Sequence, residues 1–199
     1  DVLAENIMMD DNICASFTLR TPWGIDAVKL NIPGVHNVSN ALAAVSAGLT
    51  IGLDQSSLVH SLSKIELSPM RMDLRRTNSG TLVINDSYNA NPASMNAAID
   101  TLISVDAETR IAVLGLMAEL GDRSAAEHRK IANRLDKSGT YVISVGVKEY
   151  GGVQVTTWEE ALEKLHESGL LGDSSVVLIK GSRVAGLDKV AEALHNEIR

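Results

Sequence analysis

Short apolar runs alternate with helical patterns over the last two thirds of the chain, and this alternation constrains the fold more than any other feature. The runs predict strands at Leu82–Ile84, Ile111–Leu114, Tyr141–Val145, Val153–Val155 and Val176–Ile179. The segments between and after them predict helices at Ser94–Ile103, Ala125–Leu135, Trp158–His166 and Leu187–Ile198. Apolar strands separated by helices are typical of a mainly parallel sheet covered on both faces. We therefore expect a three-layer α/β domain of about 130 residues, an ordinary domain size.

The first 68 residues have a different pattern. Alternating runs at Ile13–Leu19 and Val28–Ile32 flank a turn and predict a β-hairpin. An alanine-rich helix is expected over Asn37–Gly48 and a second one over Gln55–Ser63. A hairpin with two helices is too small for a sound core. We therefore predict two parts, with residues 1–68 as the tail of another domain and residues 69–199 as the α/β domain.

Composition excludes several classes of protein. The net charge of −7 argues against a protein that binds the nucleic-acid backbone. No run approaches 18 apolar residues, so we expect no membrane span. The first residues lack the pattern of a signal peptide and a starting Met, so we expect a cytoplasmic protein cut from a longer chain. The single cysteine, Cys14, excludes a disulfide within the chain and is expected to be a small buried side chain.

The polar segment Asn85–Pro92 directly follows one of the apolar strands. It brings Asp86, Asn89 and Asn91 together at the carboxyl end of a strand, where open α/β sheets bind ligands. The alternative is purely structural, because an Asx-turn and a helix cap use the same residue types.

Two asparagines and one arginine are further candidates. Asn37 and Asn40 share one face at the start of the alanine-rich helix, where two amides can read a base edge or cap the helix. Arg71 lies at the joint between the two parts, and its planar guanidinium suits a phosphate. A salt bridge with Asp73 or with a neighbouring helix is the structural alternative. Arg75 and Arg76 are expected to form a solvated edge.

Two more strand ends carry polar segments. Gly115–Asp122 has glycines for tight turns and two acidic side chains, but no Gly-x-Gly-x-x-Gly fingerprint of dinucleotide binding is present. Lys180–Arg183 offers two cations and a hydroxyl that could grip a carboxylate or a phosphate. The histidines of the predicted helices show no metal-ligand spacing, so we assign no metal-ligating residue.

Taken in order, these segments resemble the Mur ligases, the ATP-dependent amide-forming enzymes of peptidoglycan precursor synthesis. The matching segments are Gly34–Ala44, Asn85–Pro92, Val113–Gly121 and Lys180–Arg183. The last three resemble the family member that adds D-alanyl-D-alanine to a UDP-N-acetylmuramoyl-tripeptide. The resemblance implies a Rossmann-like C-terminal domain preceded by the end of the central ATPase domain. It also implies ATP and Mg²⁺ as cofactors and a monomeric parent enzyme.

The resemblance also implies roles for individual residues. Asn37 and Asn40 match asparagines that approach the adenine. Arg71 matches the arginine that reaches the ATP phosphates, and Asp86 matches an aspartate that holds the ribose or supports that arginine. These two are the implied catalytic residues. The residues implied to border the reaction centre or the D-alanyl-D-alanine pocket are Asn89, Asn91, Ser182 and Arg183.

The chain departs from the family pattern at several points. Met70 and Asp73 stand where the family often has Gly and Glu, and Leu116 stands where it often has Asp. The phosphate-binding Gly-x-x-Gly-Lys-[Ser/Thr] motif is absent from these 199 residues. We therefore expect this chain alone to have no ligase activity.

Two other interpretations remain at this point. One is a stand-alone α/β module that binds a nucleotide or a peptide. The other is a sister ligase, which adds a diamino acid or extends folate with glutamate. Those relatives usually have His within the segment that reads Tyr88–Asn91 here, and they differ at Lys180–Arg183.

Overall fold

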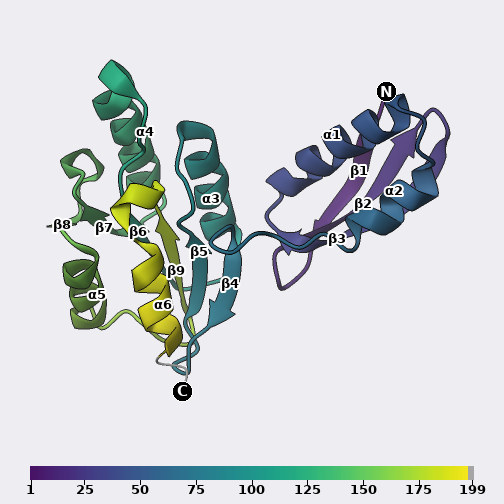
Figure 1. The fold of residues 1–199 in the computed structure, drawn as a ribbon. Coiled ribbons are helices and arrows are strands. Elements are labelled where there is room, and N and C mark those ends of the chain that lie inside the picture. Colours follow the sequence, from purple (N-terminus) through teal and green to yellow (C-terminus); the bar gives the residue numbers. More distant parts are fainter. Residues whose placement is uncertain (197–199) are drawn as a thin grey trace. The chain divides into compact units, whose positions relative to one another are not determined.

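The computed structural model describes residues 1–196 and contains two compact units, Asp1–Leu67 and Ser68–Arg199 (Figure 1). Each unit has its own sheet. The predicted end of the last helix, Ile198, lies outside the described residues.

The N-terminal unit is a three-stranded antiparallel sheet with two helices. Its strands are β1 (Leu3–Met9), β2 (Cys14–Thr21) and β3 (Gly24–Pro33), in that order, followed by α1 (His36–Thr50) and α2 (Gln55–Leu62). The predicted hairpin is β2 and β3. Strand β1 was not predicted, because most of its side chains are exposed and a bulge between Glu5 and Met8 interrupts its alternation.

The N-terminal unit has a hydrophobic core of its own, contrary to the expectation from its size. Alternate residues of β2 and β3 turn inward and meet the apolar side of α1. The buried members are Ala15, Phe17, Leu19, Val28, Leu30, Ile32, Val38, Ala41, Val45 and Leu62. Cys14 is also buried, as expected, and burial raises the pKa of its thiol.

The C-terminal unit is built on a six-stranded sheet in the order β4-β5-β9-β6-β7-β8. The strands are β4 (Asp73–Arg76), β5 (Leu82–Asp86), β6 (Thr109–Leu114), β7 (Tyr141–Val145), β8 (Val153–Val155) and β9 (Ser175–Lys180). All neighbours pair in parallel except β4 with β5. The prediction of a mainly parallel sheet is therefore confirmed. The antiparallel edge strand β4 was missed because Asp-Leu-Arg-Arg shows no apolar alternation.

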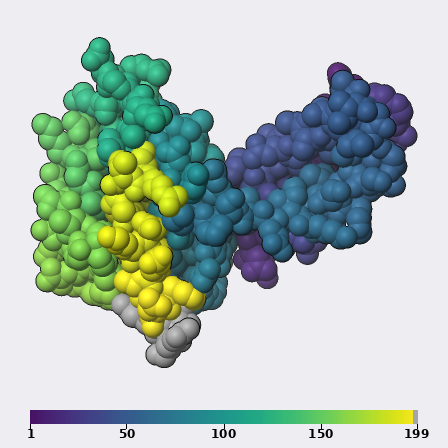
Figure 2. Space-filling view, viewed as in Figure 1, coloured from purple at the N-terminus to yellow at the C-terminus, as the bar shows by residue number. Residues whose placement is uncertain are grey.

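Helices cover both faces of this sheet. The main helices are α3 (Pro92–Ser104), α4 (Ser124–Lys137), α5 (Trp158–Glu167) and α6 (Asp188–Asn196), and short 3-10 turns occur at Gly121–Arg123, Lys148–Tyr150 and Arg183–Ala185. Ile111 and Val113 of β6 pack toward α5 and α6, so the alternate residues of this strand face α3 and α4. In Figure 2 the yellow residues of α6 lie at the surface, between green and teal parts of the unit.

Strand β9 lies between β5 and β6 and is buried along its whole length. The chain leaves β5 and β6 toward α3 and α4, but it leaves β9 toward α6 on the other face. Connections that diverge in this way open a crevice at the carboxyl ends of the strands, which is where open α/β sheets hold ligands.

Candidate functional site

A buried ion pair joins the carboxyl ends of β5 and β9. Asp86 and Lys180 are register partners on the two strands, and Lys180 Nζ lies 2.5 Å from Asp86 Oδ2. Only 1% of the lysine side chain is exposed, and its ammonium also donates to the carbonyl of Asn89 at 3.0 Å. The expectation that the Lys180–Arg183 segment offers two cations to a ligand is therefore wrong for Lys180, because its charge is used inside the protein.

The same aspartate holds the bend that presents Arg71. Asp86 Oδ1 accepts a hydrogen bond from the Met72 backbone N–H at 3.1 Å, and the Tyr88 N–H donates to the Met70 carbonyl at 3.1 Å. Met70 and Met72 both have left-handed backbone, with φ of 63° and 48°. Such backbone is costly for these side chains and persists where surrounding contacts enforce it. The Arg71 bend and the Asp86 loop are therefore one connected corner of the unit.

The side chain of Arg71 lies over the ring of Tyr88, with 4.3 Å between the guanidinium carbon and the ring centroid. The guanidinium carbon of Arg183 lies 5.7 Å from the same centroid. Both arginines are exposed. The salt bridge of Arg71 with Asp73, considered from the sequence, is not formed, because Asp73 pairs with Arg75 at 2.9 Å.

The two asparagines of the Asp86 loop shape the backbone. Asn91 caps α3: its side chain accepts from the Ser94 N–H at 2.9 Å, and the Ser94 hydroxyl accepts from the Asn91 N–H at 3.1 Å. Asn89 Oδ1 accepts from the Ala90 N–H at 2.8 Å. The helix cap considered from the sequence is thus confirmed for Asn91, and contact of either residue with a substrate stays a prediction.

Ser182 connects two loops at the same corner. It is buried, and its hydroxyl accepts from the Ala118 N–H at 2.9 Å and donates to the Ala90 carbonyl at 3.4 Å. Its role in the structure is therefore to hold the loop after β6 against the loop after β5. Its neighbour Arg183 is the exposed member of this segment, and contact of either with a substrate stays a prediction.

Two buried side chains, His128 and Tyr150, form hydrogen bonds with the backbone of the loop after β6. His128 Nε2 accepts from the Met117 N–H at 2.9 Å, and Nδ1 lies 2.7 Å from the Ser124 carbonyl, so the ring is neutral with its proton on Nδ1. The Tyr150 hydroxyl donates to the Gly115 carbonyl at 3.2 Å, and burial raises the pKa of this phenol. The sequence assigned no role to these residues.

Asn37 and Asn40 lie at the start of α1 in the N-terminal unit. The Asn37 side chain is buried; it donates to the Pro33 carbonyl at 2.8 Å and accepts from Asn40 Nδ2 at 2.9 Å. The two amides share one helix face, as predicted. The capping alternative is wrong, because α1 has no side-chain cap. Asn40 is the exposed member, and a contact with adenine stays a prediction.

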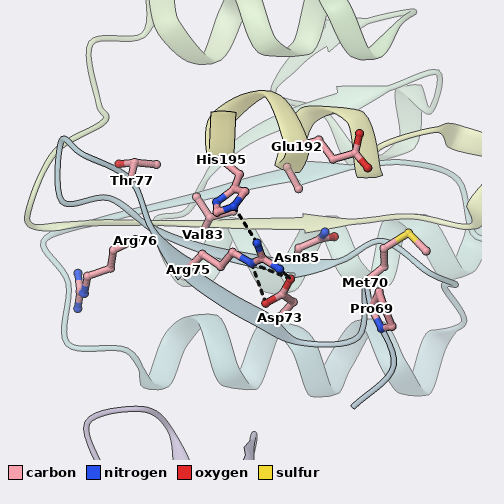
Figure 3. A pocket seen from close by; sticks show the side chains of 11 residues that line it. Pro69, Met70, Asp73, Arg75, Arg76, Thr77, Val83, Asn85, Glu192 and His195 are labelled. Atoms are coloured by element: carbon pink, nitrogen blue, oxygen red, sulfur yellow. Dashed lines mark hydrogen bonds and ion pairs between the residues drawn. The ribbon is translucent and has the colours of Figure 1, made fainter. Parts of the chain in front are cut away.

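A cavity of about 150 Å³ lies between β4, β5 and α6 and is bordered by Met70 of the Arg71 bend (Figure 3). Arg75 crosses it, paired with Asp73 and with Nη1 2.8 Å from His195 Nε2. Arg75 is exposed on the edge strand β4, as expected from the sequence, and it also makes these two contacts. None of the predicted site residues lines this cavity.

Sequence reasoning did not find the roles of two members of the corner, Lys180 and Tyr88. The signal for Lys180 was present, because a lysine that ends an otherwise uncharged strand needs a buried partner. The partner became visible only with the strand order, which places Asp86 directly beside it. Tyr88 was recognised as part of a motif, but its contacts with two arginines depend on tertiary structure.

Comparison with known proteins identifies the family. The family described as "Mur ligase, glutamate ligase domain" matches residues 70–183. The chain belongs to the Mur ligase family.

Individual members of the Mur ligase family match beyond that domain. The UDP-N-acetylmuramoyl-tripeptide–D-alanyl-D-alanine ligase of Escherichia coli (strain K12) is 33% identical over 202 residues, covering 98% of this chain and 44% of the relative. The enzyme of that name from Bacillus subtilis (strain 168) is 33% identical over 178 residues, 82% of this chain and 38% of the relative. A crystal structure of MurF from Acinetobacter baumannii superimposes with a TM-score of 0.89 at 31% identity, over 98% of this chain and 45% of that one. The chain thus spans less than half the length of the relatives it matches.

Within residues 1–196, no group of three or more His, Cys, Asp or Glu side chains is arranged to hold a metal ion. No helix in that part of the chain is long and apolar enough to cross a bilayer.

Proposed function

We propose that this chain is the C-terminal part of an ATP-dependent ligase that adds D-alanyl-D-alanine to a UDP-N-acetylmuramoyl-tripeptide in the cytoplasm. Residues 1–68 then form the tail of the central ATPase domain, and residues 69–199 form the C-terminal domain of the ligase. The observation that carries the proposal is the convergence of three family segments at one end of the sheet. They are the loop after β5, which begins at Asp86, the loop after β6 and the segment Lys180–Arg183. The names of the similar proteins support the choice of substrates.

The residues at this corner suit the handling of a phosphoryl group. Arg71 is exposed and, within the described C-terminal unit, forms no ion pair, so its guanidinium is available for the ATP phosphates. The Asp86 carboxylate is held by Lys180 and by the Met72 N–H. We infer that Asp86 acts mainly by fixing the Arg71 bend, and that a ribose contact adds to this role.

The remaining assignments follow the family pattern. Asn37 and Asn40 approach the adenine, Arg183 with Ser182 faces the incoming dipeptide, and Asn89 and Asn91 border the reaction centre. ATP supplies the phosphoryl group that activates the substrate carboxylate, and Mg²⁺ offsets the charge of its phosphates. No residue among 1–196 is proposed here as a ligand of Mg²⁺.

A chimera tests the proposal. This chain replaces the matching 44% of the Escherichia coli relative, and phosphate release is measured with ATP, Mg²⁺, the tripeptide substrate and D-alanyl-D-alanine. We expect release that requires both substrates, and none from the 199-residue chain alone. No release by a folded chimera would contradict the proposal, and release with a diamino acid or glutamate instead of D-alanyl-D-alanine would favour a sister ligase.

Calorimetry distinguishes a part of a ligase from a stand-alone binding module. A severed part of a ligase binds ATP weakly, because the motif that grips the β- and γ-phosphates is absent from these residues. Micromolar binding of ATP to the isolated chain would favour the module.

A further inference from the structure

The two exposed arginines of the corner share one aromatic ring. Arg71 comes from the bend before β4 and Arg183 from the turn after β9, so they are more than 100 residues apart in the sequence. Both guanidinium carbons nevertheless lie within the range of a cation–π contact with Tyr88, at 4.3 and 5.7 Å from its centroid.

The charge of this pair is not neutralised within the described C-terminal unit. Neither arginine forms a salt bridge there, and the Asp86 carboxylate of this corner is paired with Lys180. Two like charges held near each other repel, and the negative face of an aromatic ring offsets part of this cost. Two guanidinium groups beside one ring and without an internal carboxylate offer several N–H donors to an anion with several oxygens.

The backbone around the ring is fixed on both sides. The Tyr88 N–H donates to the Met70 carbonyl, beside Arg71, and Ser182, beside Arg183, donates to the Ala90 carbonyl of the Tyr88 loop. The ring is half-buried and is therefore held where both arginines reach it.

We propose that Tyr88 is a positioning residue whose ring holds the guanidinium groups of Arg71 and Arg183 together as one receptor for a phosphoryl group. This inference rests on the proposed function and deepens it. Arg183 then acts on the same anion as Arg71, rather than on the incoming dipeptide alone.

The test uses the 199-residue chain and inorganic triphosphate, and follows the arginine Nε–Hε signals by NMR, assigned with Arg71→Lys and Arg183→Lys. Both signals should shift with a single dissociation constant. Tyr88→Leu should raise that constant about threefold to tenfold, and Tyr88→Phe, which keeps the ring, should stay within about twofold. Trp158→Leu is the matched control, because it removes a ring under Lys189 (5.4 Å) elsewhere in the unit and should change nothing.

Three results would overturn the proposal: no binding of triphosphate, a response from only one of the two arginines, or unchanged affinity in Tyr88→Leu. The outcome is separate from that of the chimera, because binding of triphosphate by this chain requires neither the tripeptide nor turnover. If both arginine signals respond to triphosphate but the chimera has no ligase activity, the proposed function is contradicted and the proposed receptor is not.

Discussion

Strands β5 and β9 have neutral polar side chains at their amino ends and charged side chains at their carboxyl ends. At the amino ends, Thr81 and Ser175 are buried and share hydrogen bonds with each other and with both backbone groups of Gly172. At the carboxyl ends, Asp86 and Lys180 form a buried ion pair beside a bend with left-handed backbone.

The two ends therefore differ in what they can offer a ligand. The amino-end cluster is neutral and its hydroxyl groups are hydrogen-bonded within the protein, so its residues have no exposed charge to offer a ligand. The carboxyl-end corner keeps strained backbone and exposed arginines, which are features of functional sites. Substitutions at the two ends should therefore have different consequences.

The largest loss of stability is expected from Lys180→Met at the carboxyl end. It leaves the Asp86 carboxylate partly buried without its cation, which should lower the free energy of unfolding by about 3 to 5 kcal/mol. Urea denaturation measures this, and the double variant Lys180→Met/Asp86→Asn should recover part of the loss. A cost of less than about 1 kcal/mol would show that the pair does not hold the corner together.

Gly115→Ala should cost less, at about 1 to 3 kcal/mol, through overpacking of the carboxyl end. A Cβ at Gly115 would lie 2.7 Å from the Ala185 Cβ and 3.1 Å from Leu187 Cδ1. Gly172→Ala at the amino end is the matched control, because a Cβ there meets no atom of the described residues within 4 Å. Equal melting temperatures for the two variants would contradict this packing argument.

Thr81→Val tests the amino-end cluster. The substitution keeps the shape of the side chain but removes a hydroxyl that accepts from the Gly172 N–H at 2.8 Å, so we expect a loss of about 1 to 2 kcal/mol. Affinity for inorganic triphosphate should not change in the folded variant. Weaker binding of triphosphate by this variant would contradict the view that only the carboxyl ends of the strands contribute to anion binding.

The smallest effect on stability is expected from Arg183→Lys. This side chain is exposed and, within the described unit, its only recorded partner is the Tyr88 ring, so the free energy of unfolding should change by no more than about 0.5 kcal/mol. Affinity for triphosphate should nevertheless fall, because an ammonium lacks the planar fork of a guanidinium. Unchanged affinity would remove Arg183 from the receptor.

Much of the fold could be predicted from the sequence, since buried parallel strands are continuous apolar runs. The two missed strands, β1 and β4, lie at sheet edges and have no fully buried residue, so hydrophobic periodicity carries no signal for them. The size of the N-terminal core was underestimated for the same local reason: its inward-facing residues are spread over elements far apart in sequence.

The site was predicted less completely than the fold. Motifs marked the Asp86 loop and the Lys180–Arg183 segment, but they did not show which side chains face each other. Lys180 was expected to bind a ligand, but it pairs with Asp86 inside the protein. Tyr88 was expected only as part of a polar loop, but its ring contacts two arginines. These distinctions depend on strand order and register, which a local pattern does not contain.

The most direct test of the central claim is the rate of phosphate release by the chimera carrying Arg71→Ala, compared with the chimera carrying Thr81→Val. The account places phosphoryl handling at the carboxyl-end corner, so Arg71→Ala should slow release by about a hundredfold or more at saturating substrates. Thr81→Val should change the rate by less than about threefold once folding is confirmed. A chimera that keeps its rate without Arg71, or that loses it equally without the Thr81 hydroxyl, would contradict the account.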